Sequence, residues 1–192
     1  MRMNDSSVRR NRVQWTRCIC VCVILFSAPW CDGQTGTAKI TVSANVQSSI
    51  GLVFDNNAAV GTNGFCPLTN AGTNNVGLDM GQASFTTGDS LACVQFFQFF
   101  GFYVVSSAFD VVVTKANSTS ANYQLAASLA TAPPTNVFWT INTFTVLTTT
   151  FTTFQNTNNY GQRVTETLGV VVNQNVPAQT LFETINFLAT AN

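Results

Sequence analysis

The sequence predicts an all-β protein, an antiparallel β-sandwich of about eight to ten short strands. After residue 37 the chain is rich in Thr, Asn, Ser and Val and contains very little Glu, Lys or Arg. This composition favours strands over exposed helices. Several short segments alternate apolar and polar residues, which indicates strands with one buried face. Turn residues separate these segments about every dozen residues, a spacing typical of sandwiches and not of alternating strand–helix units.

The first predicted strand is AKITVSANVQ, residues 38–47, which places Ile40, Val42, Ala44 and Val46 on one face. Alternation of this kind gives a strand with one dry face. The segments that follow differ in composition, and from it we expect a strand at 49–54, an Asn- and Gly-rich loop at 55–75, a short strand at 75–81 and a turn at 84–90.

Residues 91–105, LACVQFFQFFGFYVV, form the most apolar segment of the predicted domain. A membrane span needs roughly 20 apolar residues, and this segment is shorter and contains glutamines. A helix would have to include Gly101 and two adjacent β-branched valines. As a single strand, the segment has apolar residues on both faces. We therefore expect a central strand that is covered on both sides, with a bulge at Gly101.

The remaining segments repeat the alternating pattern. We expect strands at 109–117 and 118–130, one long bent strand or two strands within 138–154, a strand at 163–174 and a final strand at 180–192. The intervening turns are expected at 132–136, where Pro133 and Pro134 exclude a central strand, and at 155–162 and 175–179.

Residues 1–33 have the layout of a secretory signal peptide. Five arginines and one acid in residues 1–17 precede an apolar run at 18–28 that is too short to span a bilayer. We expect cleavage near Gly33, with Ala38 as the second candidate site. The exported protein is then a single domain, residues 34–192, secreted or held at the cell surface, with no membrane span after cleavage.

Signal cleavage changes the charge balance. The predicted domain keeps three positive charges, Lys39, Lys115 and Arg163, against six carboxylates, which gives a net charge of −3. Binding to nucleic acid requires clustered lysines and arginines that neutralise phosphates. The sequence therefore excludes nucleic acid as a partner.

Two cysteines remain in the predicted domain, Cys66 and Cys93. In an exported domain they are expected to form one disulfide, and the alternative is a pair of buried free thiols. A metal site built from two cysteines without histidine is disfavoured.

The chain contains no histidine, which excludes catalytic Ser–His and Cys–His pairs and histidine metal sites. Phosphate-binding glycine motifs are also missing from the sequence. The six carboxylates are expected to be mostly solvated, near turns or on exposed strand faces, and not to form a catalytic pair. We therefore expect a protein that is not an enzyme and that uses no cofactor or metal.

Several segments together resemble a group of exported bacterial β-sandwich proteins whose shape is similar to spore coat protein U and to chaperone–usher pilin-like domains. The segments that carry the resemblance are residues 38–54, Cys66 with Cys93, residues 109–130 and residues 184–192. The resemblance implies an immunoglobulin-like sandwich and a role as a surface or fimbrial subunit. In pilins a chaperone binds the last strand, and an N-terminal extension completes the sheet of a neighbouring subunit.

By this resemblance the first and last strands are the candidate segments for strand exchange. Their apolar faces consist of Ile40, Val42, Ala44 and Val46 in the first strand and Ile185, Phe187 and Ala189 in the last. The alternative is that both strands pair inside their own domain.

We therefore expect a secreted, non-enzymatic structural or surface protein, a pilin-like or matrix subunit that assembles by β-strand addition. Its expected partners are further copies of itself or a periplasmic chaperone. The alternative is a carbohydrate- or ligand-binding β-sandwich module in which Tyr160 and Trp139 contact the ligand.

Overall fold

The structure, a computed structural model, describes residues 36–45, 50–116, 118–142 and 145–192. These residues belong to one compact unit, Gly33–Asn192. The predicted signal peptide and Val46 lie outside the described residues. Within the described ranges, no helix is long and apolar enough to cross a membrane.

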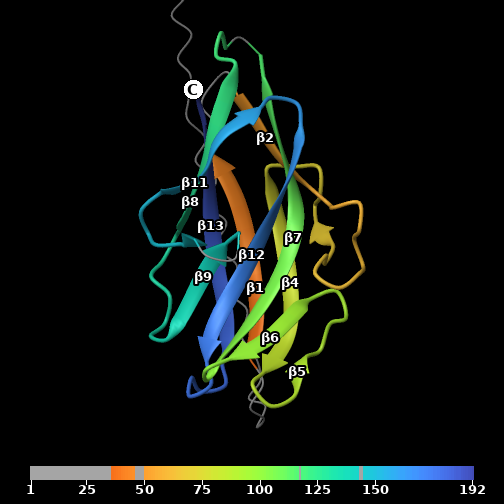
Figure 1. Cartoon of the computed structure of the whole chain (residues 1–192), viewed down its shortest axis with the longest axis vertical. Helices are drawn as coiled ribbons and strands as arrows, with labels where there is room; N and C mark the ends of the chain where they lie inside the picture. The colour runs from red at the N-terminus through yellow and green to blue at the C-terminus, as the bar shows by residue number, and fades with distance from the viewer. Residues whose placement is uncertain (1–35, 46–49, 117, 143–144) are drawn as a thin grey trace, which may run out of the picture. The chain divides into compact units, whose positions relative to one another are not determined.

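The described chain forms two β-sheets (Figure 1). Sheet A has the strand order β11 (Thr152–Asn159), β8 (Asn122–Leu129), β13 (Thr180–Ala191), β1 (Gly36–Asn45), β4 (Asn75–Ser84) and β3 (Leu68–Thr69), with β5 (Gly88–Asp89) also paired to β4. Sheet B has the order β10 (Thr145–Val146), β9 (Val137–Ile141), β12 (Arg163–Asn173), β7 (Phe102–Lys115) and β2 (Ile50–Asp55), with β6 (Gln95–Phe99) also paired to β7.

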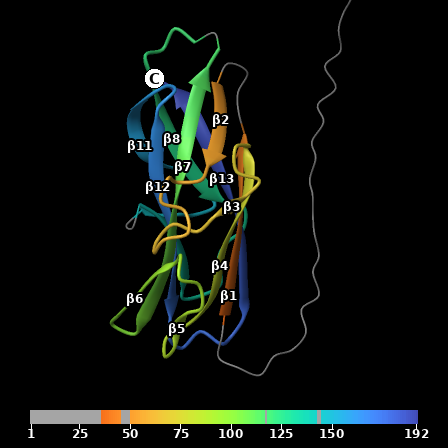
Figure 2. The same ribbon diagram turned by 90° about the vertical axis from the view of Figure 1, so that its right-hand side faces the viewer.

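The two sheets pack face to face, so the predicted all-β sandwich is confirmed. In Figure 2, β7 and β12 of sheet B lie on one side of the domain and β1 and β4 of sheet A on the other. Apolar residues at alternate positions fill the space between them, as the period of two predicts. Phe187 of sheet A stands edge-on to Phe54 and Phe109 of sheet B, with ring centroids 5.1 and 6.0 Å apart. Such contacts hold the two layers in register.

The first strand, β1, is an interior strand of sheet A. It runs antiparallel to β4 and parallel to β13, with register pairs from Thr37↔Thr180 to Asn45↔Leu188. This parallel pair is the exception to the predicted antiparallel arrangement. The next strand, β2, belongs to sheet B, so the chain changes sheets between β1 and β2.

The apolar segment 91–105 folds differently from the single central strand predicted from the sequence. It forms a β-hairpin in which β6 returns through Phe100 and Gly101 into β7. Both turn residues have positive φ, +44° at Phe100 and +79° at Gly101, as a two-residue type I′ turn requires. The predicted bulge at Gly101 is therefore wrong. Glycine at this position supplies the left-handed conformation of the turn.

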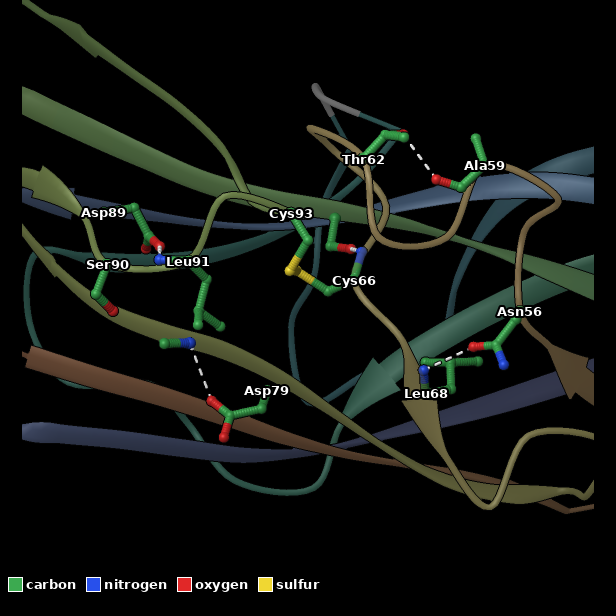
Figure 3. Close-up of a disulfide and its surroundings, with 12 residues drawn as sticks. Asn56, Ala59, Thr62, Cys66, Leu68, Asp79, Asp89, Ser90, Leu91 and Cys93 are labelled. Carbon is green, nitrogen blue, oxygen red and sulfur yellow. Dashed lines mark hydrogen bonds between the residues drawn. A yellow bond between two sulfur atoms is a disulfide. The ribbon is translucent and has the colours of Figure 1, made fainter.

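The predicted disulfide joins Cys66 and Cys93, with an S–S distance of 2.05 Å (Figure 3). It ties the loop that precedes β3 to the start of the β6–β7 hairpin. The Cys66 backbone N–H donates a hydrogen bond to the Ser107 hydroxyl of β7, at 2.8 Å. On the same loop, the Asn56 side chain accepts a hydrogen bond from the backbone of Leu68, at 2.7 Å. The loop is therefore fixed against both sheets.

Candidate functional site

The candidate strand-exchange residues of the first strand lie on the core face of β1. Ile40 and Val42 are 2% and 1% exposed, and Ala44 is half-buried. The candidates in the last strand, Ile185 and Phe187, are fully buried in β13. Ala189, the third of them, is also buried in β13. In this structure both strands pair inside their own domain.

Contacts along β1 join it to both neighbouring strands. The Ser43 hydroxyl donates a hydrogen bond to the Asn186 side chain of β13, at 3.0 Å. On the other side, the Lys39 ammonium lies 3.8 Å from the Asp79 carboxylate of β4, and both groups are well exposed. An exposed ion pair of this kind contributes little to stability. β1 is therefore held mainly by its backbone ladders and its apolar face.

The position of β1 allows strand exchange, because β1 separates two strands that would otherwise have open edges. Without β1, the backbone groups of β13 and β4 that now pair with it lose their partners. The core face also loses the side chains of Ile40 and Val42. What remains is a slot that is open to another strand with the same apolar spacing.

The two candidate ligand-contact aromatics lie apart and in different surroundings. Trp139 of β9 is 1% exposed in the core, so a ligand at the surface cannot contact its ring. Tyr160 lies between β11 and β12 and is half-buried. Its ring centroid is 5.2 Å from that of Tyr123, and the Lys115 ammonium lies 5.0 Å from the same centroid. The Tyr160 ring is thus already in contact with other residues of the domain.

A buried polar cluster, which the sequence analysis did not identify, surrounds Glu166 of β12. Glu166 is completely buried, and its Oε2 atom accepts a hydrogen bond from the Asn142 side chain, at 2.6 Å. Its Oε1 atom has no hydrogen-bond partner among the described residues, and neither do the hydroxyls of Tyr123 and Tyr160. A buried polar atom without a partner costs about 1–3 kcal/mol.

Burial also sets the ionisation of this cluster. Loss of hydration raises the pKa of Glu166 to about 7, although interactions with Asn142 and Gln155 partly oppose the rise. The pKa of Tyr123 is raised to about 12, mainly by burial and then by the nearby charges of Glu166 and Tyr160. Glu166 therefore changes its protonation near neutral pH inside the core.

The expectation that the carboxylates are mostly solvated is wrong for Asp110, Glu166 and Glu183, which are all buried. Glu183 accepts hydrogen bonds from the Thr131 hydroxyl, at 3.0 Å, and from the backbone of Thr184, at 3.0 Å. For two of these carboxylates, the alternation of apolar and polar residues along the strand indicates burial. Glu166 shares a face with Leu168, and Glu183 shares a face with Ile185, so both point inward.

A surface groove of about 410 Å³ lies beside the loop between β12 and β13. Its lining carries no charged residue and includes two aromatic rings and three side-chain amides, those of Phe85, Tyr103, Gln174, Asn175 and Gln179. Aromatic faces together with amide groups can bind a small neutral polar molecule. Neither Tyr160 nor Trp139 lines this groove.

In the part of the chain that the structure describes, no three His, Cys, Asp or Glu side chains come together as metal ligands would. No protein-family model matches the sequence, and no curated protein is significantly similar to it.

Proposed function

We propose that the protein is a secreted, non-enzymatic structural subunit of the cell surface or extracellular matrix, which assembles by β-strand addition. The observation that supports this proposal best is the position of β1. An N-terminal strand lies in the middle of a sheet, next to the C-terminal strand, and the following strand belongs to the other sheet. Such a strand can be replaced by the same strand of another subunit without rearrangement of the rest of the domain.

A strand in the β1 position contributes a large part of the stability of the domain, whether it comes from the same chain or from another subunit. Burial of a Val or Ile side chain contributes about 1.5–3 kcal/mol, so Ile40 and Val42 together contribute about 3–6 kcal/mol. A whole domain has a stability of about 5–15 kcal/mol. A subunit without β1 is therefore expected to be close to unfolding, and a donated strand restores it.

Removal of residues 37–48 and addition of a peptide of residues 36–48 test the proposal. We expect the shortened protein to associate or to lose most of its stability, and the peptide to bind it and restore a stable monomer. Size exclusion and urea unfolding with and without peptide measure both effects. A shortened protein that remains an equally stable monomer refutes strand donation.

Two altered peptides provide a matched control. Ile40→Asp places a charge on the buried face, whereas Lys39→Asn changes a neighbouring exposed residue without setting a second carboxylate opposite Asp79. Only Ile40→Asp should abolish rescue of the shortened protein, because only that carboxylate would be buried without a partner.

The uncharged groove supports a second candidate function, binding of a small neutral carbohydrate. Gln174→Ala and Tyr103→Phe should then weaken binding on a glycan array, and Tyr160→Phe should leave it unchanged because Tyr160 lies outside the groove. An array on which the protein binds no glycan excludes this candidate.

A further inference from the structure

The outer face of sheet B has a group of exposed phenylalanines at the β6–β7 hairpin. Phe97 and Phe99 are each 41% exposed, and Phe100 at the tip is 99% exposed. The rings of Phe97, Phe99 and Phe102 form a stacked series, with successive centroids 6.1 and 5.9 Å apart. The largest apolar patch on the surface of a monomeric protein is often functional, so this group of rings is a candidate interaction surface.

The tip of the hairpin adds to this pattern. Phe100 has a φ of +44°, a conformation that costs a non-glycine residue about 1 kcal/mol or more, and Asn or Gly is the usual residue there. A large apolar side chain that is strained and fully exposed gains nothing inside the monomer.

The backbone of β6 offers a free edge next to this patch. The two-residue turn makes Phe99 and Phe102 a hydrogen-bonded pair, so Phe97 and Gln95 also bond to β7. The N–H and C=O groups of Phe96 and Gln98 therefore point away from β7. No backbone hydrogen bond from these groups occurs among the described residues. In Figure 2 the strand lies at the margin of the domain.

The other strands at sheet margins are protected against pairing. β3, β5 and β10 have two residues each, and β11 is interrupted by two shifts of register. At the edge of β2, the Phe54 backbone N–H donates to the Thr73 carbonyl and the Phe54 carbonyl accepts from the Gly72 N–H. β6 lacks two of the usual protections, since residues 90–109 contain no charge and no proline.

We propose that β6 pairs with β6 of a second copy of this chain, antiparallel and across a two-fold axis. Phe96 then lies opposite Gln98 of the second copy, and these pairs use all four outward-pointing backbone groups of each strand. Phe97 lies opposite Phe97 of the second copy in a pair without hydrogen bonds, where cross-strand side chains approach most closely. A strand without charge does not repel its own copy, which favours a second copy over a charged partner.

The exposed area sets the expected strength. At about 200 Å² for a phenylalanine, the exposed parts of Phe97, Phe99 and Phe100 amount to roughly 350 Å². A standard interface buries about 800 Å² on each partner. The dimer is therefore weak and reversible, with a population that depends on concentration. It forms through β6 of sheet B, whereas β1 lies in sheet A, so the dimer does not depend on exchange of β1.

Sedimentation velocity of the full-length protein from low to high micromolar concentration tests the proposal. We expect a reversible monomer–dimer equilibrium that Phe97→Lys weakens by about tenfold or more, because edge lysines block strand pairing. Gln98→Pro should act similarly, since it removes an outward N–H and leaves the β7 ladder intact. It also removes the hydrogen bond from the Gln98 side chain to the Phe85 carbonyl, so Gln98→Ala, which removes that bond alone, is its control and should not change the equilibrium. Phe182→Lys is the matched control: Phe182 is 61% exposed on sheet A, and its loss should not change the equilibrium.

Oxidative cross-linking tests the register. Phe97→Cys should give a disulfide-linked dimer, and Gln95→Cys, on the same face of the same strand, should not, because Gln95 lies opposite Phe99 of the second copy. Circular dichroism of every variant shows whether the sandwich is intact. Intact Phe97→Lys and Gln98→Pro variants that dimerise like the original protein overturn the proposal.

Three further results also overturn it: a protein that is monomeric at every concentration, an equal loss on Phe182→Lys, and a monomer that binds neutral phosphatidylcholine vesicles through Phe97 and Phe100. The last result would make the patch a lipid-binding surface. These outcomes are distinguishable from a failure of β1 exchange. The β6 variants do not alter residues 36–48, so the peptide experiment on the shortened protein still tests β1 exchange by itself.

Discussion

Replacing Glu166 with glutamine should remove a pH dependence of stability that the buried carboxyl group imposes. The ordinary pKa of this group is 4.5, and burial raises it to about 7 in the folded protein. Between these values the folded state holds a proton that the unfolded state has lost. The contribution of Glu166 to the free energy of unfolding is therefore largest below pH 4.5. It is lost as the pH rises through 7.

The size of the effect follows from the same two values. At 1.36 kcal/mol per pKa unit, the rise corresponds to about 3 kcal/mol of stability lost between about pH 4.5 and pH 8. The chain contains no histidine, so no other side chain with an ordinary pKa titrates in the middle of this window. Such a loss is a large part of the stability of a domain of this size.

Glutamine keeps the shape of the side chain but cannot ionise. Its oxygen can accept the hydrogen bond from Asn142, as Oε2 of Glu166 does, and its amide nitrogen takes the place of Oε1, which has no partner among the described residues either. Glu166→Gln should thus match the original protein near pH 5 and exceed its free energy of unfolding by up to about 3 kcal/mol at pH 8.

Urea unfolding followed by circular dichroism between about pH 5 and pH 8 measures this difference. Glu183→Gln is a matched control, because it alters another buried carboxylate and should leave the loss of stability with rising pH in place. The reasoning fails if the original protein has the same stability throughout this range, or if Glu166→Gln shows the same decline.

Three further predictions concern the stability of the fold. Replacing both Cys66 and Cys93 with alanine should lower the free energy of unfolding by about 3–4 kcal/mol, because the disulfide closes a loop with a sequence separation of 27. An equal urea midpoint in the oxidised original protein and the double variant would contradict this. Phe187→Ala should cost about 3–5 kcal/mol, since its buried ring meets three other phenylalanine rings, whereas exposed Phe182→Ala should cost little in the same unfolding assay. Phe100→Asn should raise the thermal midpoint and add about 1 kcal/mol by relieving the left-handed conformation; an unchanged or lower midpoint would show that the tip is not strained.

Alternation predicted most of the sandwich, because each strand with one buried face has a period of two that the sequence displays directly. The core positions of β1 and β13 follow from this period, and so does the inward orientation of Glu166. The strand order does not. Nothing in the local pattern of residues 38–47 indicates that the first strand lies between β4 and β13, since long-range pairing depends on the whole set of edges.

The sequence did not predict the β6–β7 hairpin, because its turn lacks the residue pair that usually marks a two-residue turn. Asn-Gly or Asp-Gly is the common type I′ turn, and here phenylalanine precedes Gly101 between two aromatic strands. An apolar run across a turn looks like one strand. The candidate surface formed by Phe97, Phe99 and Phe100 was hidden for the same reason, since a single central strand would have buried these rings.

The parallel pairing of β1 with β13 also fixes the order in which the chain can fold. Ser43 and its partner Asn186 are separated by 143 residues, and synthesis proceeds from the N-terminus. β1 can pair early with β4, but its second neighbour exists only when the last strand has been made. Closure of sheet A is therefore a late event with a large loop-closure cost, which predicts slow folding. Until that moment the newly made chain has one open edge on β1, whose unpaired backbone groups are exposed to pairing with other strands.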